Sequence, residues 1–285
     1  MTVAISPIQS HDLAEVGQFL HEQLNNRFSA EMWISSLTHR WAADVPNHGM
    51  QLRDGDRLVG VFCAIYSDQI IEGRQERFCN PHSWCVLASH RQHGIGLLLK
   101  LIKQPNYHFT MFTPNPKVAK VFLGLKFENL DDRQYISFNP PSPAVWRSGT
   151  FVIWQPDLIS ARLAGQDLQD FEAHRDFPWL RFVAFGAGDD VCWVIYKPSR
   201  WKRLPSAWIL HVSNAEAFAR HDRLLRNHLV TRHGIVTMRL EARMVSERPD
   251  WSLLQQRNQP KLLKSSSLSA AQVRDLYSEL MALDV

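Results

Sequence analysis

One segment of the sequence combines an apolar strand, a loop with two glycines and an apolar helix. It reads Trp84-Cys-Val-Leu-Ala-Ser-His-Arg91-Gln-His-Gly94-Ile-Gly96 and continues as Leu-Leu-Leu-Lys-Leu-Ile102. The first amides of a helix lack partners within the helix and carry the positive end of its dipole. Glycines at 94 and 96 remove the Cβ atoms that would hold an anion away from the backbone, and Arg91 adds a positive charge. The segment therefore predicts a pyrophosphate site.

The specificity of this pattern comes from its position. An Arg or Gln followed by two residues, Gly, any residue and Gly or Ala arises by chance in roughly one chain in four of this length. Its placement directly between a predicted strand and a predicted helix makes the match more specific. It is neither a Walker loop nor the GxGxxG pattern of dinucleotide-binding folds, because the spacing of its glycines differs from both.

Three histidines lie close to this loop: His82, His90 and His93. His82 is a candidate general base, because the ordinary pKa of imidazole lies near neutral pH. The alternative is a surface histidine at the start of the strand. His93 belongs to the loop itself, where its backbone matters more than its side chain.

Two further residue patterns offer other chemistries. Cys79, His82 and Cys85 resemble zinc ligands, but a fourth ligand is missing nearby and one cysteine lies inside a predicted strand, so we predict buried thiols and no metal. The run from Lys197 to Arg203 is basic and contains a tryptophan. It could bind nucleic acid, but a loop with such charges is usually a solvated face, so nucleic acid is not the expected partner.

Length and composition restrict the class of protein. The chain has 285 residues, of which 45% are hydrophobic and 21% charged, with a net charge of +4. This length suggests two domains, and this composition excludes a disordered chain. The first residues do not resemble a secretory signal, no apolar stretch is long enough to span a membrane, and four cysteines do not form a disulfide framework. We expect a reduced, cytoplasmic protein with no membrane partner.

Strands alternate with helices in the first half, after an opening hairpin, which is typical of an α/β domain with a mixed sheet. The predicted helices are 10–24, with Ser10 as the N-cap, 30–41, 94–103 and 116–125, and the predicted strands are 3–5, 50–52, 58–66, 83–88, 107–112 and 127–138.

A proline-rich segment at 139–147 predicts a linker, because proline cannot continue a helix or a central strand. It divides the chain into predicted domains 1–138 and 148–285. The second half repeats the order of the first. Its predicted helices are 157–175, 215–232 and 269–283, the last with a capping box of Ser269 and Gln272, and its predicted strands are 180–185, 191–196, 208–213 and 235–245.

Short sequence echoes suggest that the second half is an internal duplication of the first. Gly55-Asp56 precedes Ile65-Tyr66 as Gly188-Asp189 precedes Ile195-Tyr196, and Trp84 to Ser89 is matched in spacing by Trp208 to Ser213. Asn-Ala-Glu-Ala-Phe follows Ser213, so the second copy lacks the glycine loop.

The first half resembles the GCN5-related N-acetyltransferases (the GNAT family). Their signature, a strand ending in Val and then Arg/Gln-x-x-Gly-x-Gly/Ala at the start of a helix, matches Val86 and Arg91 to Gly96. Further landmarks of the family match Asn115, Ala119, Phe122 and Phe127 in spacing. Two departures are Phe122, where the family has Tyr, and Lys126, where it has Gly.

This resemblance implies two GNAT-like domains, the second a degenerate copy, each with a mixed, mostly antiparallel sheet flanked by helices. It implies acetyl-CoA or another acyl-CoA as co-substrate, with the backbone of Cys85 and Val86 binding the pantetheine and Asn115 in contact nearby. The pyrophosphate would lie on the loop of Arg91, Gln92, His93, Gly94, Ile95 and Gly96.

The leading hypothesis is therefore an acyltransferase that transfers an acyl group, in the first instance acetyl, to an amine or hydroxyl of a small-molecule acceptor. Loss of the family's Tyr removes its usual proton donor, but a thiol with a pKa near 8.5 is a tolerable leaving group without one. The alternative is a catalytically inactive GNAT-fold module that binds CoA or a protein partner. The acceptor and the acyl chain length are not specified by the sequence, and a homodimer is left open.

Overall fold

Two β-sheets organise the protein, and each contains strands from both halves of the sequence. The computed structural model describes residues 3–38, 41–142, 148–257 and 259–284. The chain forms two units: unit 1 contains the residues up to Asn129, 261–273 and those from Tyr277 onward, and unit 2 contains 130–260 and 274–276. The units thus differ in extent from the predicted domains 1–138 and 148–285. Of the predicted linker, residues 143–147 lie outside the described part.

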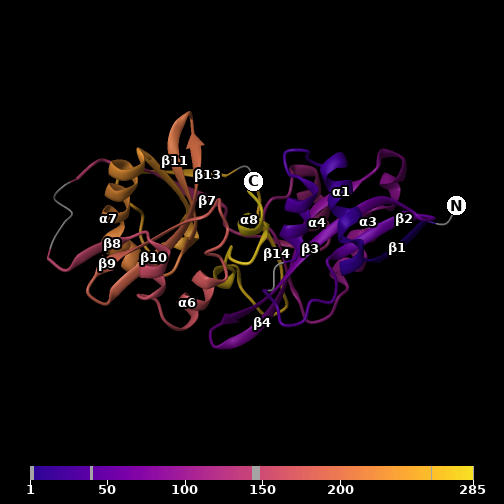
Figure 1. Ribbon diagram of the computed structural model, residues 1–285, viewed down its shortest axis with the longest axis horizontal. Coiled ribbons are helices and arrows are strands. Elements are labelled where there is room, and N and C mark those ends of the chain that lie inside the picture. The colour runs from indigo at the N-terminus through magenta and orange to yellow at the C-terminus, as the bar shows by residue number, and fades with distance from the viewer. Residues whose placement is uncertain (1–2, 39–40, 143–147, 258, 285) are drawn as a thin grey trace. The chain divides into compact units, whose positions relative to one another are not determined.

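Unit 1 contains a seven-stranded sheet with strand order β1-β2-β3-β4-β5-β14-β6. Neighbouring strands pair antiparallel except β4 and β5, which are parallel. Figure 1 shows the yellow strand β14 within this indigo-to-magenta unit. The strands are β1 (Val3–Pro7), β2 (Gly49–Asp54), β3 (Arg57–Ile71), β4 (Arg74–Val86), β5 (His108–Met111), β6 (Glu128–Asn129) and β14 (Leu262–Lys264).

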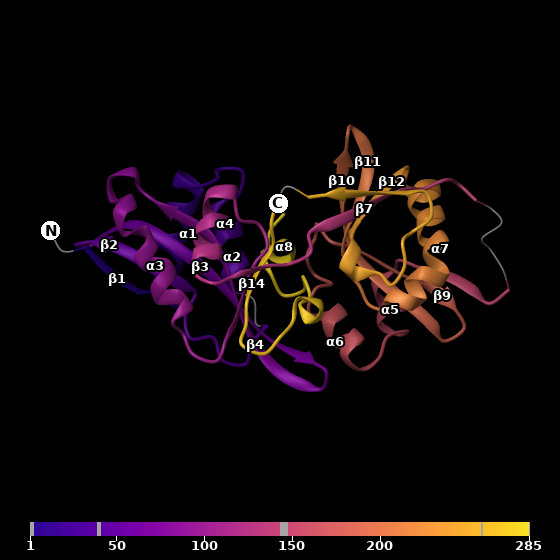
Figure 2. The ribbon, with the colours of Figure 1, turned by 180° about the vertical axis from the view of Figure 1, so that it is seen from behind.

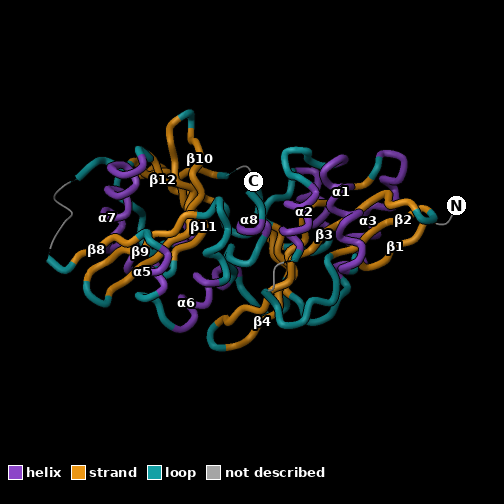
Figure 3. Tube along the Cα trace, viewed as in Figure 1, coloured by secondary structure: helices purple, strands orange, loops and turns teal. Residues whose placement is uncertain are grey.

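Helices cover both faces of this sheet (Figure 3). Apolar residues of α1 (Leu13–Gln23) and α2 (Ala30–Leu37) pack with Val61 and Cys63 on one face. Apolar residues of α3 (Gly94–Ile102) and α4 (Pro116–Gly124) pack on the other face. These helices form because their apolar residues recur at helical spacing, so that each helix buries one side against the sheet.

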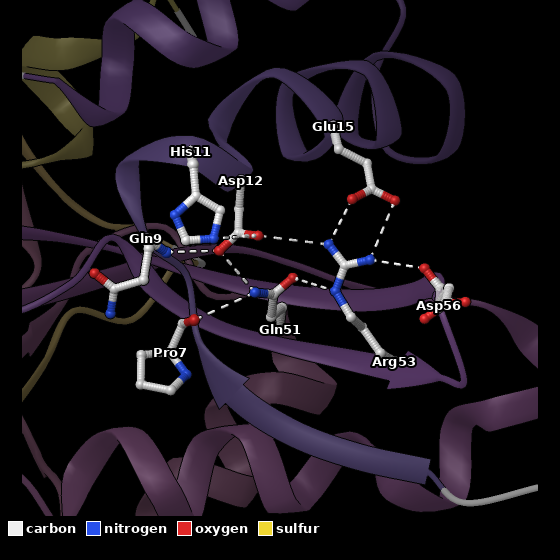
Figure 4. Close-up of polar contacts among 8 residues, drawn as sticks. All are labelled: Pro7, Gln9, His11, Asp12, Glu15, Gln51, Arg53 and Asp56. Atoms are coloured by element: carbon white, nitrogen blue, oxygen red, sulfur yellow. Dashed lines mark hydrogen bonds and ion pairs between the residues drawn. The ribbon is translucent and has the colours of Figure 1, made fainter.

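A polar cluster fixes the start of α1 to strand β2 (Figure 4). The Asp12 carboxylate accepts hydrogen bonds from the Gln9 amide and from Gln51 Nε2, both at 2.8 Å. Arg53 donates to Gln51 Oε1 at 2.9 Å and pairs with Glu15. The prediction of Ser10 as the N-cap was wrong. Ser10 is the first residue of a short 3₁₀ turn (Ser10–Asp12), the N-cap of that turn is Gln9, and the N-cap of α1 is Asp12.

Unit 2 repeats the architecture of unit 1, with strand order β8-β9-β10-β11-β12-β7-β13 and one parallel pair, β11 and β12. The strands are β7 (Arg133–Phe138), β8 (Thr150–Ile153), β9 (Arg181–Ala187), β10 (Asp190–Trp201), β11 (Leu204–Val212), β12 (Thr237–Glu241) and β13 (Ser252–Gln256). Helix α7 (Ala215–His233) packs on one face of this sheet. Helices α5 (Pro156–Ser160) and α6 (Gly165–Glu172) replace the single predicted helix 157–175, and Gly165, the first residue of α6, has a positive φ of 56°.

The two sheets exchange one strand each. Strand β7 follows β6 in the sequence, but it pairs with β12 and β13 in unit 2 (Figure 2). Conversely, β14 follows β13 but pairs with β5 and β6 in unit 1. Both exchanged strands occupy the sixth position of their sheet. The predicted strand 127–138 is therefore two strands that belong to different sheets.

The C-terminal segment departs most from its prediction. Instead of one helix over 269–283, it forms a 3₁₀ turn (Ala270–Gln272) and the short helix α8 (Glu279–Ala282). The predicted capping box is present, since Gln272 Oε1 accepts from the Ser269 amide at 2.9 Å. All four residues of α8 are buried, and α8 belongs to unit 1.

Candidate functional site

The candidate site of unit 1 lies where β4 and β5 separate. The two parallel strands pair only at Phe78 with His108 and at Cys79 with Phe109. Strand β4 continues to Val86, and over this stretch its edge on the β5 side has no strand partner among the described residues. A divergent pair of parallel strands leaves backbone groups of β4 open to a ligand, because they are not used in a ladder.

A β-bulge at Ser83 reorients the end of β4. Trp84 pairs with Phe62 and His82 with Cys63, so Ser83 is the extra residue, and its φ is 53°. Positive φ is uncommon for a residue other than glycine, and bulges of this kind occur near functional sites. Sequence reasoning missed Ser83, because a serine in a strand carries no signal of a bulge.

The glycine loop has the local structure expected for anion binding. Residues Ala88–His93 form a 3₁₀ turn and α3 begins at Gly94. In the described part of the chain no side chain caps α3, and its first turn contains no acidic residue. Arg91 and Gln92 are exposed beside this helix end. The Gly94 amide donates within the loop, to the Arg91 carbonyl, so an anion would bind the following amides and the Arg91 side chain.

The two loop glycines meet different surroundings. A Cβ atom on Gly94 would lie 3.5 Å from Val86 Cγ2, an ordinary contact, whereas one on Gly96 would lie 2.6 Å from Ile5 Cδ1. The contact at 96 is with the end of a flexible side chain that can move aside, so packing does not strictly require glycine there. The protein itself leaves room for a side chain at 94, so a glycine there is not explained by packing.

The predicted pantetheine-binding residues, Cys85 and Val86, are partly buried at the end of β4. Val86 packs on the α3 and α4 side of the sheet and Cys85 on the α1 and α2 side. Burial raises the pKa of the Cys85 thiol, while the positive charge of Arg91 acts in the opposite direction. Cys85 is thus a neutral thiol whose backbone, rather than its sulfur, is available at the strand edge.

His82 lies in the middle of β4 and is 3% exposed. Its Nδ1 is 2.9 Å from the Ser83 hydroxyl. The prediction that it stands at the start of the strand was wrong, because β4 begins at Arg74 as the second strand of a long hairpin with β3. The histidine is therefore enclosed next to the bulge.

Asn115 lies directly before α4, and Phe122 belongs to that helix. Asn115 is the exposed N-cap, and its Oδ1 accepts from the amides of Lys117 and Val118, both at 3.0 Å. This leaves only its Nδ2 as a donor to a ligand. Phe122 is fully buried, with its ring 4.7 Å from that of Phe127, and so contributes no hydroxyl to the site.

The equivalent helix end in unit 2 is blocked. Strand β11 has the same bulge, at Leu210, because Ile195 pairs with His211 and Tyr196 with Ile209. The N-cap of α7 is Asn214, whose Oδ1 accepts from two amides of the first turn at 3.1 and 3.0 Å. Glu216 adds a negative charge to the same turn. The first turn of α7 is therefore already capped and unfavourable for an anion.

The sequence features behind other chemistries are separated in space. Cys79 packs on the α3 and α4 side of the sheet and Cys85 on the opposite side, so these thiols do not converge on one ion. Among the described residues no group of three or more His, Cys, Asp or Glu is placed to hold a metal.

In the basic run, Lys197 is buried, whereas Lys202 is exposed with its Nζ 4.9 Å from the centre of the Trp201 ring. No helix in the described residues is long and apolar enough to cross a membrane.

Comparison with known proteins gives matches only at the level of structure. No protein-family model and no curated protein matches the sequence. A GCN5-related N-acetyltransferase from Anabaena variabilis ATCC 29413 superposes with a TM-score of 0.63 at 8% identity, covering 92% of this chain and 72% of that one. A protein of unknown function from Enterococcus faecalis V583, described as a probable N-acyltransferase, gives 0.62 at 10% identity, covering 95% and 74%.

A third structure, a GCN5-related N-acetyltransferase from Kribbella flavida, gives a TM-score of 0.56 at 14% identity and covers 92% of this chain and 71% of that one. Each alignment spans nearly the whole chain and so includes most of both units. Likeness at such low identity shows the architecture alone. The chain has the fold of the GCN5-related N-acetyltransferases.

Proposed function

We propose that the protein is an acyl-CoA-dependent acyltransferase, with acetyl-CoA or another acyl-CoA as co-substrate and a small-molecule amine or hydroxyl as acceptor. The observation that carries this proposal is the uncapped start of α3, which follows a bulged strand at the point where β4 and β5 diverge. The capped and acidic start of α7, at the same position of unit 2, supports a single site in unit 1.

The residues present fit the anionic co-substrate. The amides that begin α3 and the exposed Arg91 would hold the pyrophosphate, and the open backbone of Cys85 and Val86 would bind the pantetheine amides. An acyl-CoA supplies a thioester whose carbonyl the acceptor attacks. A backbone N–H near the bulge would stabilise the oxyanion that forms in this step.

Binding is tested by thermal unfolding with acetyl-CoA, longer acyl-CoAs and free CoA. A ligand present at 100 times its Kd stabilises the folded state by about 2.7 kcal/mol. Gly94→Glu and Arg91→Ala should abolish or reduce this stabilisation, because they add a negative charge or remove a positive one at the helix end. Gly124→Glu, in open space at the end of α4, and Arg74→Ala, at the exposed start of β4, are the matched controls. Equal stabilisation of all four variants would refute the site.

A second candidate is an inactive CoA-binding module. It is favoured by Phe122, which places a buried ring where the related enzymes have a tyrosine. Assays that follow release of the CoA thiol, with a panel of amines and alcohols as acceptors, separate the two functions. Steady release that depends on the acceptor supports the enzyme, and binding without release supports the module.

A further inference from the structure

Helix α8 places one acidic side chain inside the gap between β4 and β5. Glu279 is 2% exposed and belongs to unit 1, although it is far in sequence from both strands. The charged form of a carboxyl is costly to bury, so such a residue needs either compensating partners or a function.

Hydrogen bonds connect Glu279 to both sides of the gap. Its amide donates to Asn80 Oδ1 of β4 at 2.9 Å. Its Oε1 accepts from the Phe112 amide at 3.1 Å and from the Thr113 hydroxyl at 3.0 Å, just after β5. Asn80 in turn donates to the Thr110 carbonyl at 3.1 Å. The carboxyl is thereby held rigidly where the pairing of β4 and β5 ends.

The second oxygen of this carboxyl is in a different situation. Oε2 is buried, and no residue in the described part of the chain makes a hydrogen bond to it. Burial also raises the pKa of the Glu279 carboxyl, while its bonds to Thr113, Asn80 and Phe112 act in the opposite direction. Within the described ranges Oε2 is thus free of protein donors, and a general base needs such an oxygen within hydrogen-bond reach of the proton that it takes.

Titratable groups on the neighbouring elements are the alternative candidates for a base. His82 lies on β4, two residues beyond Asn80, and Lys261 precedes β14 with its Nζ 4.9 Å from the ring of Phe112. On α2, which packs near α8, the titratable residue is Glu31, and it is exposed. His82 is therefore the competing candidate for a base.

We propose that Glu279 is the general base of acyl transfer, a role that rests on the proposed function. Because Oε2 is buried, the side chains that cover it would have to move apart to admit an acceptor amine, which would then bind with its N–H directed at Oε2. As the nitrogen lone pair forms a bond to the thioester carbonyl carbon, Oε2 takes the proton that the nitrogen loses. The C–S bond then breaks with its electron pair on sulfur, and the protonated Glu279 returns the proton to the thiolate. The products are an amide and CoA with a free thiol.

This role also accounts for the absence of a hydroxyl at Phe122. A protonated Glu279 would serve as the proton donor to the leaving thiolate, so that one carboxyl first accepts and then donates the proton. The Asn80, Phe112 and Thr113 contacts would hold it in place through both steps.

Glu279→Gln is the direct test, because the amide keeps the shape of the side chain but cannot accept the proton. We expect kcat for CoA release with primary amines, such as an alkyl monoamine, a polyamine and an amino sugar, to fall by about 10²-fold or more. The Kd for acetyl-CoA and the melting temperature show whether the variant is folded and still binds. Glu31→Gln, a matched exposed glutamate, should behave as the wild type.

A second pair of variants tests the role of Glu279 even if the Glu279→Gln variant does not fold. Thr113→Val removes a donor to Oε1, which should shift the acidic limb of the wild-type pH profile of kcat to higher pH. His82→Gln should leave that limb in place. An active wild type whose activity survives in Glu279→Gln, or whose acidic limb moves in His82→Gln but not in Thr113→Val, overturns the assignment of the base while leaving the proposed function intact. A wild type that binds acetyl-CoA but transfers to no acceptor overturns both.

Discussion

The imidazole of His90 lies against the carboxylate of Asp54, with His90 Nε2 3.3 Å from Asp54 Oδ2. The other ring nitrogen of His90 is 2.8 Å from the Ser89 hydroxyl. Both side chains of the pair are largely buried, at 15% and 19% exposed. The contact joins the 3₁₀ turn before Gly94 to the end of β2, and so fixes the loop from outside its own sequence.

We therefore expect His90→Ala to weaken acetyl-CoA binding without unfolding the protein. A hydrogen bond between two such side chains contributes about 1 kcal/mol, which corresponds to about a fivefold rise in Kd. Isothermal titration measures this change. His11→Ala, at an exposed histidine of the same unit, should leave the Kd unchanged. An unaltered Kd in His90→Ala would mean that the loop holds its shape alone.

Variants of Asn115 separate its capping role from contact with the co-substrate. Asn115→Ala should lower the free energy of unfolding by about 0.5–2 kcal/mol, because the first turn of α4 loses its cap. Asn115→Asp keeps the cap but adds a negative charge, so stability should persist while acetyl-CoA binds several-fold more weakly. The matched variant Asn214→Asp, at the start of α7, should not change acetyl-CoA affinity. Equal affinity in both Asp variants would place the co-substrate phosphates away from Asn115.

The bulge predicts that two substitutions at Ser83 differ in their effect on stability. Valine is strained at a φ of 53°, so Ser83→Val should lower the free energy of unfolding by about 1–3 kcal/mol. Glycine adopts this conformation freely, so Ser83→Gly should stay within about 1 kcal/mol of the wild type. Denaturant unfolding measures both. Similar losses in the two variants would indicate that the hydroxyl, rather than the backbone, is what matters.

The strand exchange predicts that the two halves of the chain do not fold separately. Residues 1–138 alone lack β14 and α8, and residues 148–285 alone lack β7. Each half would expose unpaired strand edges and apolar core residues, and we expect it to be unfolded or aggregated by circular dichroism and gel filtration. Co-expression of the halves should restore a folded complex. A well-folded 1–138 fragment would contradict this dependence.

A buried histidine of unit 2, His211, should make the folded protein less stable in mild acid. Burial, followed by the charges of Arg274 and His174, lowers the pKa of His211 to about 3. Below pH of about 6.5 the unfolded chain protonates this histidine while the folded chain does not, so stability falls as the pH drops toward 3. Between pH 7 and 5 we expect His211 to account for a loss of about 2 kcal/mol in the free energy of unfolding.

His211→Gln should remove this part of the pH dependence, whatever its effect on stability at pH 7. His11→Gln, at an exposed histidine, should retain the wild-type slope. Chemical denaturation at several pH values measures the slopes. An unchanged slope in His211→Gln would assign the acid sensitivity to other groups, such as the buried His228, whose pKa burial lowers to about 4.

The anion loop could be predicted from the sequence because everything that defines it is local. The strand, the loop glycines and the start of α3 are contiguous from Trp84 to Ile102, so short-range rules of helix ends suffice. Glu279 could not be predicted in the same way. It contacts Thr113, 166 residues away, and only the folded chain brings them together.

Sheet membership was also beyond the sequence patterns. Apolar alternation predicts strands near 127–138, but not that β6 and β7 belong to different sheets. The repeated architecture could be inferred, although both echoes were misaligned. By the pairing around the bulges, Trp84 corresponds to His211 and not to Trp208. Relative to the bulge, Tyr196 corresponds to Cys63 and not to Tyr66, because the pairing across β10 and β11 rather than sequence similarity sets the equivalence.

Because the two sheets exchange strands, the order in which the chain is synthesised decides which unit can be completed first. Most of unit 1 leaves the ribosome before unit 2, yet its sheet is incomplete until Leu262 to Lys264 have been made, and its buried carboxyl follows later still, at residue 279. By then all seven strands of unit 2 have been translated. Synthesis of unit 1 starts before that of unit 2 but ends after it, so a chain that stops before Leu262 lacks part of the candidate site's sheet and also lacks Glu279.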